Sequence, residues 1–329
     1  MKNSITKKIS ISILIVMIVQ ILMSMVGMMD FAIKSYADDD EGEGERDGFK
    51  INWYVIYPYA NKRDAKAYVN VNGIVGQLPS NGTLDISKLE KGKIDNYPVI
   101  VRRIEAEAFY NMSNLKRVYI PNRIESIGKA AFSNTGIKEL TIPNYDGSIS
   151  ISSHAFNGCK DLKTVKIEKE LCDIDKFVFN ECTNLESISF KKGVREIMNG
   201  AFRKCYNLTS IDCKSDVKGI GDEAFADCTS LKEVKIAGEK SVTGSVTFNG
   251  IGNKAFYNCN KLTSITIPKS VKSIGEQAFK YCSSLKTVTI SNGVESIGDS
   301  AFGYCSSLKT IKIPGNVKTI GKNAFMRMY

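Results

Sequence analysis

Residues 274–302 read IGEQAFKYCSSLKTVTISNGVESIGDSAF and contain one full copy of a unit that repeats from about Arg102 to the C-terminus. A phenylalanine marks each copy, and it recurs at Phe109, Phe132, Phe156, Phe179, Phe202, Phe225, Phe256, Phe279, Phe302 and Phe325. Seven of the nine intervals are 23 residues long, and the other two are 24 and 31. A fixed period of roughly 20 to 29 residues is typical of a solenoid.

Each unit contains a short segment with strand-like alternation. After Phe279 come Leu285, Val288 and Ile290, and the last two alternate with polar residues, as a half-buried strand requires. Parallel neighbours need a return segment between them, and a unit of this length cannot bury its own apolar face. We therefore predict an α/β-type leucine-rich-repeat solenoid with one short parallel strand per ~23-residue repeat and little regular helix.

Two copies depart from the common spacing. Between Phe132 and Phe156 the Leu-equivalent residue, Ile137, arrives one residue early, and extra residues follow it. The 31-residue interval holds eight additional residues in or near 237–250, a stretch rich in Gly, Ser and Thr. Insertions in solenoids usually emerge as loops on one side, so both places are candidates for local features.

The repeating pattern I-G-x-x-A-F-x-x-C-x-x-L-x-x-V-x-I-P-x-x-V-x-x-I-G resembles the BspA-like leucine-rich repeats of bacterial surface proteins. Residues 274–298 match it at nearly every position except the proline, which is Ser291 here, and the resemblance covers about residues 97–329. The resemblance implies a secreted or surface-exposed protein that acts in binding or adhesion. That function remains an expectation, because fold does not fix function.

The N-terminal part predicts export. Lys7 and Lys8 precede an apolar run over residues 9–29, and small residues before Asp38 predict a signal peptide over 1–37. The run is also long enough for an uncleaved membrane anchor. Residues 38–48 hold seven acids and one arginine and are expected to form an acidic linker. Residues 49–98 lack the Phe mark, which predicts an atypical capping region, or else a small separate domain, ahead of the solenoid over 99–329.

The cysteines and the single histidine show no catalytic pattern. Seven of the nine cysteines lie three residues after the marker Phe, in a slot that Met112, Thr135 and Met328 occupy in other copies. A slot shared with Met predicts buried, reduced thiols, although an exported chain also admits disulfides. His154 stands where other copies have unrelated residues, so we expect a surface position without a fixed role. We predict no enzyme activity, metal or cofactor.

The positive net charge of the chain predicts a negatively charged partner. The formal net charge is +10, and residues 49–329 carry +13, because residues 1–37 carry +3 and residues 38–48 carry −6. Lysine greatly outnumbers arginine, and lysine is poorly suited to bidentate recognition, so no specific nucleic-acid site is expected. The candidate ligand face consists of lysines on the outward side of the predicted strands: Lys116, Lys138, Lys163, Lys166, Lys232, Lys235, Lys286, Lys309 and Lys312.

These features predict a secreted or cell-surface repeat protein whose strand face binds a protein or an anionic surface polymer or glycan. A structural scaffold of the cell envelope without a specific ligand is the alternative. A membrane enters only through the N-terminal segment, if it stays uncleaved. At the other end, we expect the segment Lys309 to Ile313 to form an exposed edge strand whose lysines discourage pairing with another chain.

Overall fold

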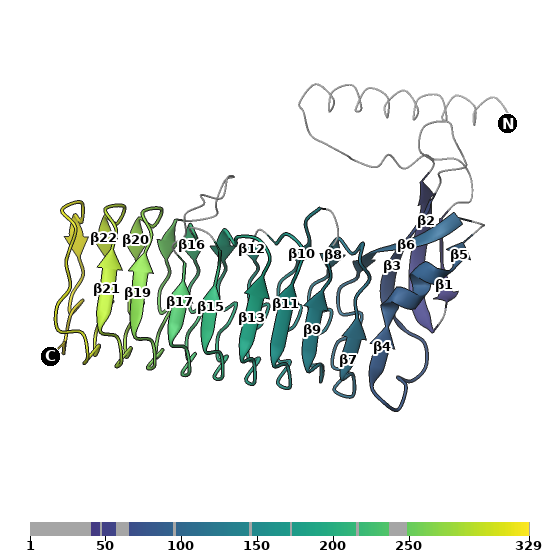
Figure 1. Ribbon diagram of the computed structural model, residues 1–329, viewed down its shortest axis with the longest axis horizontal. Coiled ribbons are helices and arrows are strands. Elements are labelled where there is room, and N and C mark those ends of the chain that lie inside the picture. Colours follow the sequence, from purple (N-terminus) through teal and green to yellow (C-terminus); the bar gives the residue numbers. More distant parts are fainter. Residues whose placement is uncertain are drawn as a thin grey trace, which may run out of the picture.

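The computed structural model describes residues 41–46, 48–56, 66–94, 97–144, 147–171, 173–214, 217–236 and 249–328. The chain winds into an elongated stack of coils, with an N-terminal sheet at one end and the C-terminus at the other (Figure 1). Residues 1–37, where the signal peptide is expected, and residues 237–248 of the insertion lie outside the described residues. Within the described part of the chain, no helix is long and apolar enough to cross a membrane.

The first sheet contains the N-terminal region and the first coils. Its order is β1 (Glu41–Arg46), β2 (Phe49–Ile56), β3 (Lys66–Ile74), β6 (Tyr97–Ile104), β8 (Ser126–Ile127) and β10 (Ser150–Ile151), and β5 (Lys93–Ile94) pairs with β6. β1, β2 and β3 are antiparallel, whereas β3, β6, β8 and β10 run parallel. Residues 41–46 were expected to belong to an acidic linker, but they form β1, because backbone pairing with β2 does not depend on the charge of the side chains.

Two further parallel sheets run along the stack. The second is β9 (Glu139–Ile142), β11 (Thr164–Ile167), β13 (Ser187–Phe190), β15 (Ser210–Asp212), β17 (Glu233–Lys235), β19 (Ser264–Ile267) and β21 (Thr287–Ile290). The third is β12 (Asp173–Ile174), β14 (Glu196–Ile197), β16 (Gly219–Ile220), β18 (Gly250–Ile251), β20 (Ser273–Ile274), β22 (Ser296–Ile297) and β23 (Thr319–Ile320). β4 (Thr83–Asp85) and β7 (Arg117–Tyr119) pair separately.

The expected α/β label and the single strand per repeat fit the structure only in part, whereas the expected repeat solenoid with little regular helix is confirmed. The only helix among the described residues is a 3-10 helix, Ile86–Lys91, and a typical coil contributes one strand to each of two parallel sheets. The 23-residue step holds between β11 and β13, where Thr164 pairs with Ser187. It fails between β9 and β11, where Glu139 pairs with Thr164, and between β17 and β19, where Glu233 pairs with Ser264. The fold is a β-solenoid in which the spacing between paired strands departs from 23 residues at these two places.

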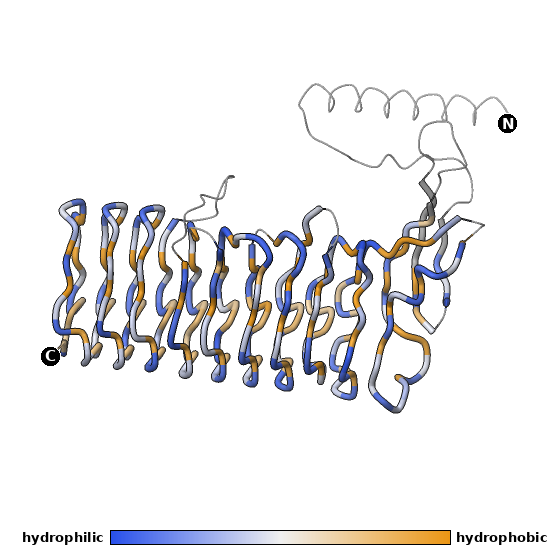
Figure 2. Tube along the Cα trace, viewed as in Figure 1, coloured by the Kyte–Doolittle hydropathy of each residue, from blue (hydrophilic) through white to orange (hydrophobic). Residues whose placement is uncertain are grey.

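The core is a continuous column of stacked side chains. The marker phenylalanines from Phe109 to Phe302 are at most 1% exposed, and neighbouring rings stack with centroids 5.0–5.7 Å apart. Phe49, Val69 and Val99 of the N-terminal sheet belong to the same core cluster. Each coil alternates hydrophobic and hydrophilic stretches (Figure 2). The stacked copies thus bury one another's apolar faces.

The C-terminal end differs from the prediction. Residues 309–313 do not form a strand, and β21 is the last strand of the second sheet. Among the described residues this segment has a strand neighbour on the β21 side alone, so fewer contacts hold it in register. Ile311 and Ile313 are half-buried against the core, while Lys309 and Lys312 are exposed.

Candidate ligand-binding face

The nine predicted lysines all point into solvent. They lie in or next to β7, β9, β11, β17 and β21, or in the coil segment after β21, and each is exposed. Along these strands the apolar residues alternate inward, as in β11, where Val165 and Ile167 are buried and Lys166 is exposed. We call the outward side of β7 and of the second sheet, from Lys116 to Lys312, the strand face.

The lysines of the strand face fall into two classes. Three have a carboxylate partner: Lys116 with Asp161 at 3.3 Å, Lys163 with Glu186 at 3.8 Å, and Lys235 with Glu233 at 3.3 Å. The other six have no carboxylate within 4.0 Å among the described residues: Lys138, Lys166, Lys232, Lys286, Lys309 and Lys312.

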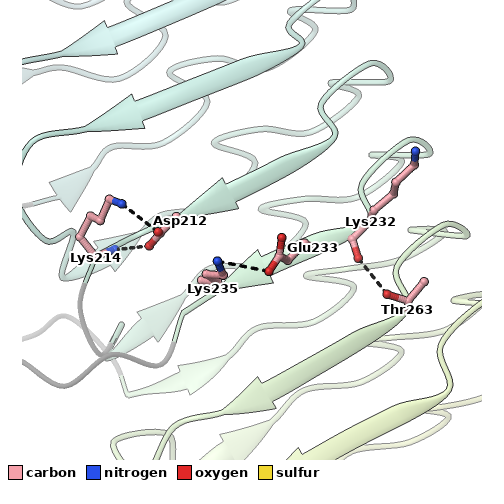
Figure 3. A network of polar contacts seen from close by, with 6 residues as sticks. All are labelled: Asp212, Lys214, Lys232, Glu233, Lys235 and Thr263. Carbon is pink, nitrogen blue, oxygen red and sulfur yellow. Dashed lines mark hydrogen bonds and ion pairs between the residues drawn. The ribbon is translucent and has the colours of Figure 1, made fainter.

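The centre of the strand face is a local network of opposite charges. Figure 3 shows Asp212 held by Lys214 and Glu233 held by Lys235, while the Lys232 side chain extends away from both pairs. Burial opposes ionisation of Asp212, but hydrogen bonds from the side chain and backbone of Lys214 outweigh it, so the pKa of Asp212 lies below its usual value. The Asp212 carboxylate is therefore ionised at neutral pH and offsets positive charge at the centre of the strand face.

Charge on the strand face is therefore concentrated at two places. The N-terminal basic end has five cations: Lys116, Arg117, Lys138, Lys163 and Lys166. Its carboxylates are Glu139 and Asp161, and Glu186 beside it pairs with Lys163. The C-terminal basic end contains Lys286, Lys309 and Lys312. Between them, Lys232 and Lys235 stand with Glu186, Asp212 and Glu233 among Ser and Thr residues. The nine predicted lysines thus fall into two basic ends and a hydroxyl-rich centre where carboxylates offset the positive charge.

The N-terminal basic end is also hollowed. A groove of about 650 Å³ runs over β4, β7 and β9, and its lining includes Thr83, Arg117, Tyr119, Lys138 and Thr141. Tyr119 is 50% exposed, which makes it one of the most exposed large hydrophobic residues in the described chain. Three cations (Lys116, Arg117 and Lys138), the carboxylate of Glu139, an exposed aromatic ring and hydroxyl groups therefore share one depression.

The groove forms because the sheet is interrupted between β7 and β9. β7 pairs with β4, β9 pairs with β11, and no ladder joins β7 to β9 in the described structure. This break coincides with the 24-residue interval that the sequence shows at Ile137. At Gly136 an added Cβ would collide with the Ser113 carbonyl oxygen and the Lys116 side chain, so glycine lets Lys116 lie across the turn toward Asp161.

Lys116 and Lys138, two of the predicted lysines, line the groove, but the sequence did not point to its other lining residues. Arg117 and Tyr119 occupy outward strand positions that hold Ser, Thr, Lys or an acid (Glu233, Asp212) in other copies, and the Arg and Tyr found only here were the available signal. Asn81 and Thr83 come from β4 and the turn before it, in the region without the Phe mark, so the repeat pattern offered no way to place them.

The remaining residues singled out from the sequence lie elsewhere. Eight described cysteines are free and buried, as predicted, and the seven that follow a marker Phe donate their thiols to the backbone oxygen of the preceding marker Phe at 3.0–3.2 Å. His154 is half-buried, not a plain surface residue, and stacks on Phe177 with ring centroids 5.0 Å apart. Burial and nearby Lys129 lower the pKa of His154, which keeps the imidazole neutral at pH 7. Among the described residues, no cluster of His, Cys, Asp or Glu could hold a metal ion.

The repeat matches a known family. Six copies of the BspA type leucine rich repeat region match residues 87–149, 139–250 and 237–329. The chain belongs to the BspA type leucine-rich-repeat family. No curated protein matches the chain.

Several solved structures are similar to it. A leucine rich cell surface protein from Faecalibacterium prausnitzii is 24% identical, with 89% of this chain and 88% of that chain covered and a TM-score of 0.46. A leucine-rich repeat protein from Bacteroides ovatus is 20% identical, with 89% and 92% covered and a TM-score of 0.42. The pneumococcal vaccine antigen PcpA is 17% identical, with 85% and 78% covered and a TM-score of 0.47.

Proposed function

We propose that this chain is an exported surface protein that binds an anionic polymer or glycan through its strand face, with the groove at the N-terminal basic end as the main contact. The observation that carries the proposal is the groove itself, where Arg117, Lys138 and the exposed Tyr119 share one depression of about 650 Å³. Repeat proteins commonly bind along the surface that their stacked units create. The predicted signal over 1–37 supports export.

The groove supplies what the lysines alone do not. A guanidinium donates two parallel hydrogen bonds to a carboxylate or sulfate, which fixes the orientation of the ligand, whereas lysine acts as a point charge. Arg117 is therefore the expected orienting contact, with Lys138 adding attraction. Tyr119 offers an aromatic ring against the apolar side of a ligand unit. Thr83 and Thr141 can donate or accept hydrogen bonds with polar groups of the polymer.

The test measures binding of the purified protein to polyglutamate, with neutral dextran as a control polymer. We expect saturable binding to polyglutamate that weakens with added salt, because exposed charges are screened over ~8 Å at physiological ionic strength. The double variant Arg117→Glu/Lys138→Glu should bind at least tenfold more weakly. Lys322→Glu, an exposed reversal in the turn after β23, should change binding less than twofold. Equal binding by the double variant and the wild type would overturn the proposal.

The competing function is a cell-envelope scaffold without a specific ligand. The ion pairs Lys116–Asp161, Lys163–Glu186 and Lys235–Glu233 favour it, because they show that part of the charge on the strand face is satisfied within the molecule. A scaffold predicts no saturable binding to polyglutamate and equal behaviour of all the variants above. A protein partner would instead show binding without the salt response. We propose a binding role and no catalytic one.

A further inference from the structure

The last described coil leaves a cross-section of the core partly uncovered. Within the described chain, β23 has a neighbour on the β22 side alone. Ile320 of β23 is 51% exposed, whereas Ile297, which stands in the same position one coil earlier, is 2% exposed. Phe325 is half-buried, although the marker phenylalanines of the preceding coils are buried. This end of the stack therefore presents both a strand edge and apolar side chains.

The opposite end of the stack is also a strand edge (Figure 1). Among the described residues, β1 pairs with β2 alone, and their register runs from Glu41 to Arg46 without a shift. Natural edge strands are often protected by bulges or prolines, and residues 41–46 contain neither. Glycines at positions 42 and 44 alternate with the acids, which lets another backbone approach closely. β1 is thus suited to accept a further strand.

The two ends carry opposite charge. Residues 38–56, which include β1 and β2, hold seven acidic and two basic residues, a net charge of −5, and Glu43 and Glu45 are exposed. Residues 295–329 hold five basic and two acidic residues, a net charge of +3. One of these basic residues, Lys318, directly precedes β23 and is exposed even though it pairs with Glu295 at 2.6 Å. An acidic edge and a basic edge attract each other, whereas two identical ends repel.

The strand directions also match. β1 and β3 are both antiparallel to β2, so they run the same way, and β6, β8 and β10 are parallel to β3. A parallel bridge between Ser148 and Glu170 connects the coil of β10 to that of β12, and the third sheet is parallel from β12 to β23. Moving a copy of the chain along the stack, without turning it over, therefore brings its β1 beside β23 as a parallel neighbour.

We propose that copies of this chain associate head to tail, with β1 of one copy pairing in parallel with β23 of another. This pairing continues the third sheet across the contact and covers Ile320 with the backbone of β1. The contact uses a different surface on each partner, so it can repeat and build an open filament. β23 has only two residues, so the ladder is short, and attraction between the charged ends must add to it. This association is separate from ligand binding at the strand face.

The experiment follows the size of the purified protein by sedimentation velocity over a series of concentrations. The wild type should form species that grow beyond dimers as the concentration rises, and added salt should weaken this growth because it screens exposed charges. Lys318→Glu/Ile320→Ser at one end and Glu43→Lys/Glu45→Lys at the other should each weaken association at least tenfold. Lys261→Glu reverses an exposed charge in a middle coil and should leave association unchanged.

Mixing the two double variants tests the direction of the contact. Each variant has one altered end and one intact end, so the intact β1 edge of the first can pair with the intact β23 edge of the second. The equimolar mixture should therefore form a one-to-one dimer that does not grow, while each variant alone stays monomeric and keeps the circular dichroism of the wild type.

Three results would overturn the proposal. A wild type that stays monomeric at every concentration would show that a second copy does not cover these edges. Growth that stops at a dimer would mean that two identical ends meet. Absence of the dimer from the mixture, with both variants folded, would exclude pairing between β1 and β23.

Discussion

At the residue scale, the side chain three residues after the marker Phe links neighbouring coils along the stack. The thiol of each of seven cysteines points to the backbone oxygen of the preceding marker Phe, so that it satisfies one polar group of the neighbouring coil. Thr135 holds the same slot and donates to the Phe132 oxygen at 2.9 Å, whereas Met112 fills it without a donor. The position thus requires a small or medium-sized side chain that fits the core, whereas a hydrogen-bond donor is present in most copies but not required.

These buried thiols should not react with thiol reagents in the native protein. Burial raises the pKa of Cys159 to about 11 and that of Cys305 to about 12, against about 8.5 for a free thiol. The eight described cysteines should therefore not react with a thiol reagent at pH 8 until denaturant is added, when close to nine groups should react. Mostly oxidised cysteines in the denatured sample would contradict this result.

The same shifts predict alkaline instability. A thiol whose folded-state pKa is raised stabilises the native state fully below about pH 8.5, and that stability is lost as the pH rises toward the folded-state value. The denaturant concentration at the unfolding midpoint should therefore decrease as the pH is raised from about 9 to about 11. The variant Cys228→Met introduces the residue type that Met112 provides at the equivalent position of another copy. It removes one titrating thiol and should make this decrease in stability smaller. An identical pH profile in this variant would argue against a role for the thiol.

At the scale of elements, the sequence predicted the second sheet well and the third not at all. Val288 and Ile290 alternate with polar residues over a four-residue strand, so the period of two is visible. The strands of the third sheet have two residues each, such as Ser296–Ile297, which is too short for any alternation to appear. The groove was missed for a different reason. It arises because β7 pairs with β4, and β4 lies outside the repeating pattern.

Removing the acids at the centre of the strand face should strengthen binding to anionic polymers. In the variant Glu186→Gln/Glu233→Gln, Lys163 and Lys235 lose their partners and add two free cations to the strand face. Affinity for polyglutamate should rise several-fold and decline more steeply with salt. Stability should change little, because each exposed pair contributes about 0–1 kcal/mol.

Isothermal titration at two salt concentrations measures both effects. Glu276→Gln makes the same type of change at an exposed residue outside the strand face and should leave the affinity unchanged. Weaker binding in the double variant would mean that these carboxylates themselves contact the ligand, which would exclude a purely anionic partner.

At the scale of the whole molecule, the separation of the two basic ends sets a length for the ligand. β9 and β21 are six strand steps apart in the second sheet, and strands lie ~4.8 Å apart, so the ends are separated by about 29 Å. A short anionic chain can contact one end only. A longer chain can contact both, and its second contact is favoured by the high effective concentration that the first creates.

Affinity for glutamate oligomers should therefore rise in a step as their length increases. An extended chain spans at most about 3.3–3.6 Å per residue, so the step should begin at about ten residues. In the variant Lys286→Gln/Lys309→Gln/Lys312→Gln the step should vanish, while oligomers of about five residues bind its groove as they bind the wild type. A gradual rise that is the same in both proteins would show that the C-terminal basic end takes no part, even if the groove binds. Because the step depends on geometry and the short-oligomer affinity on local contacts, one length series tests the stack and the groove separately.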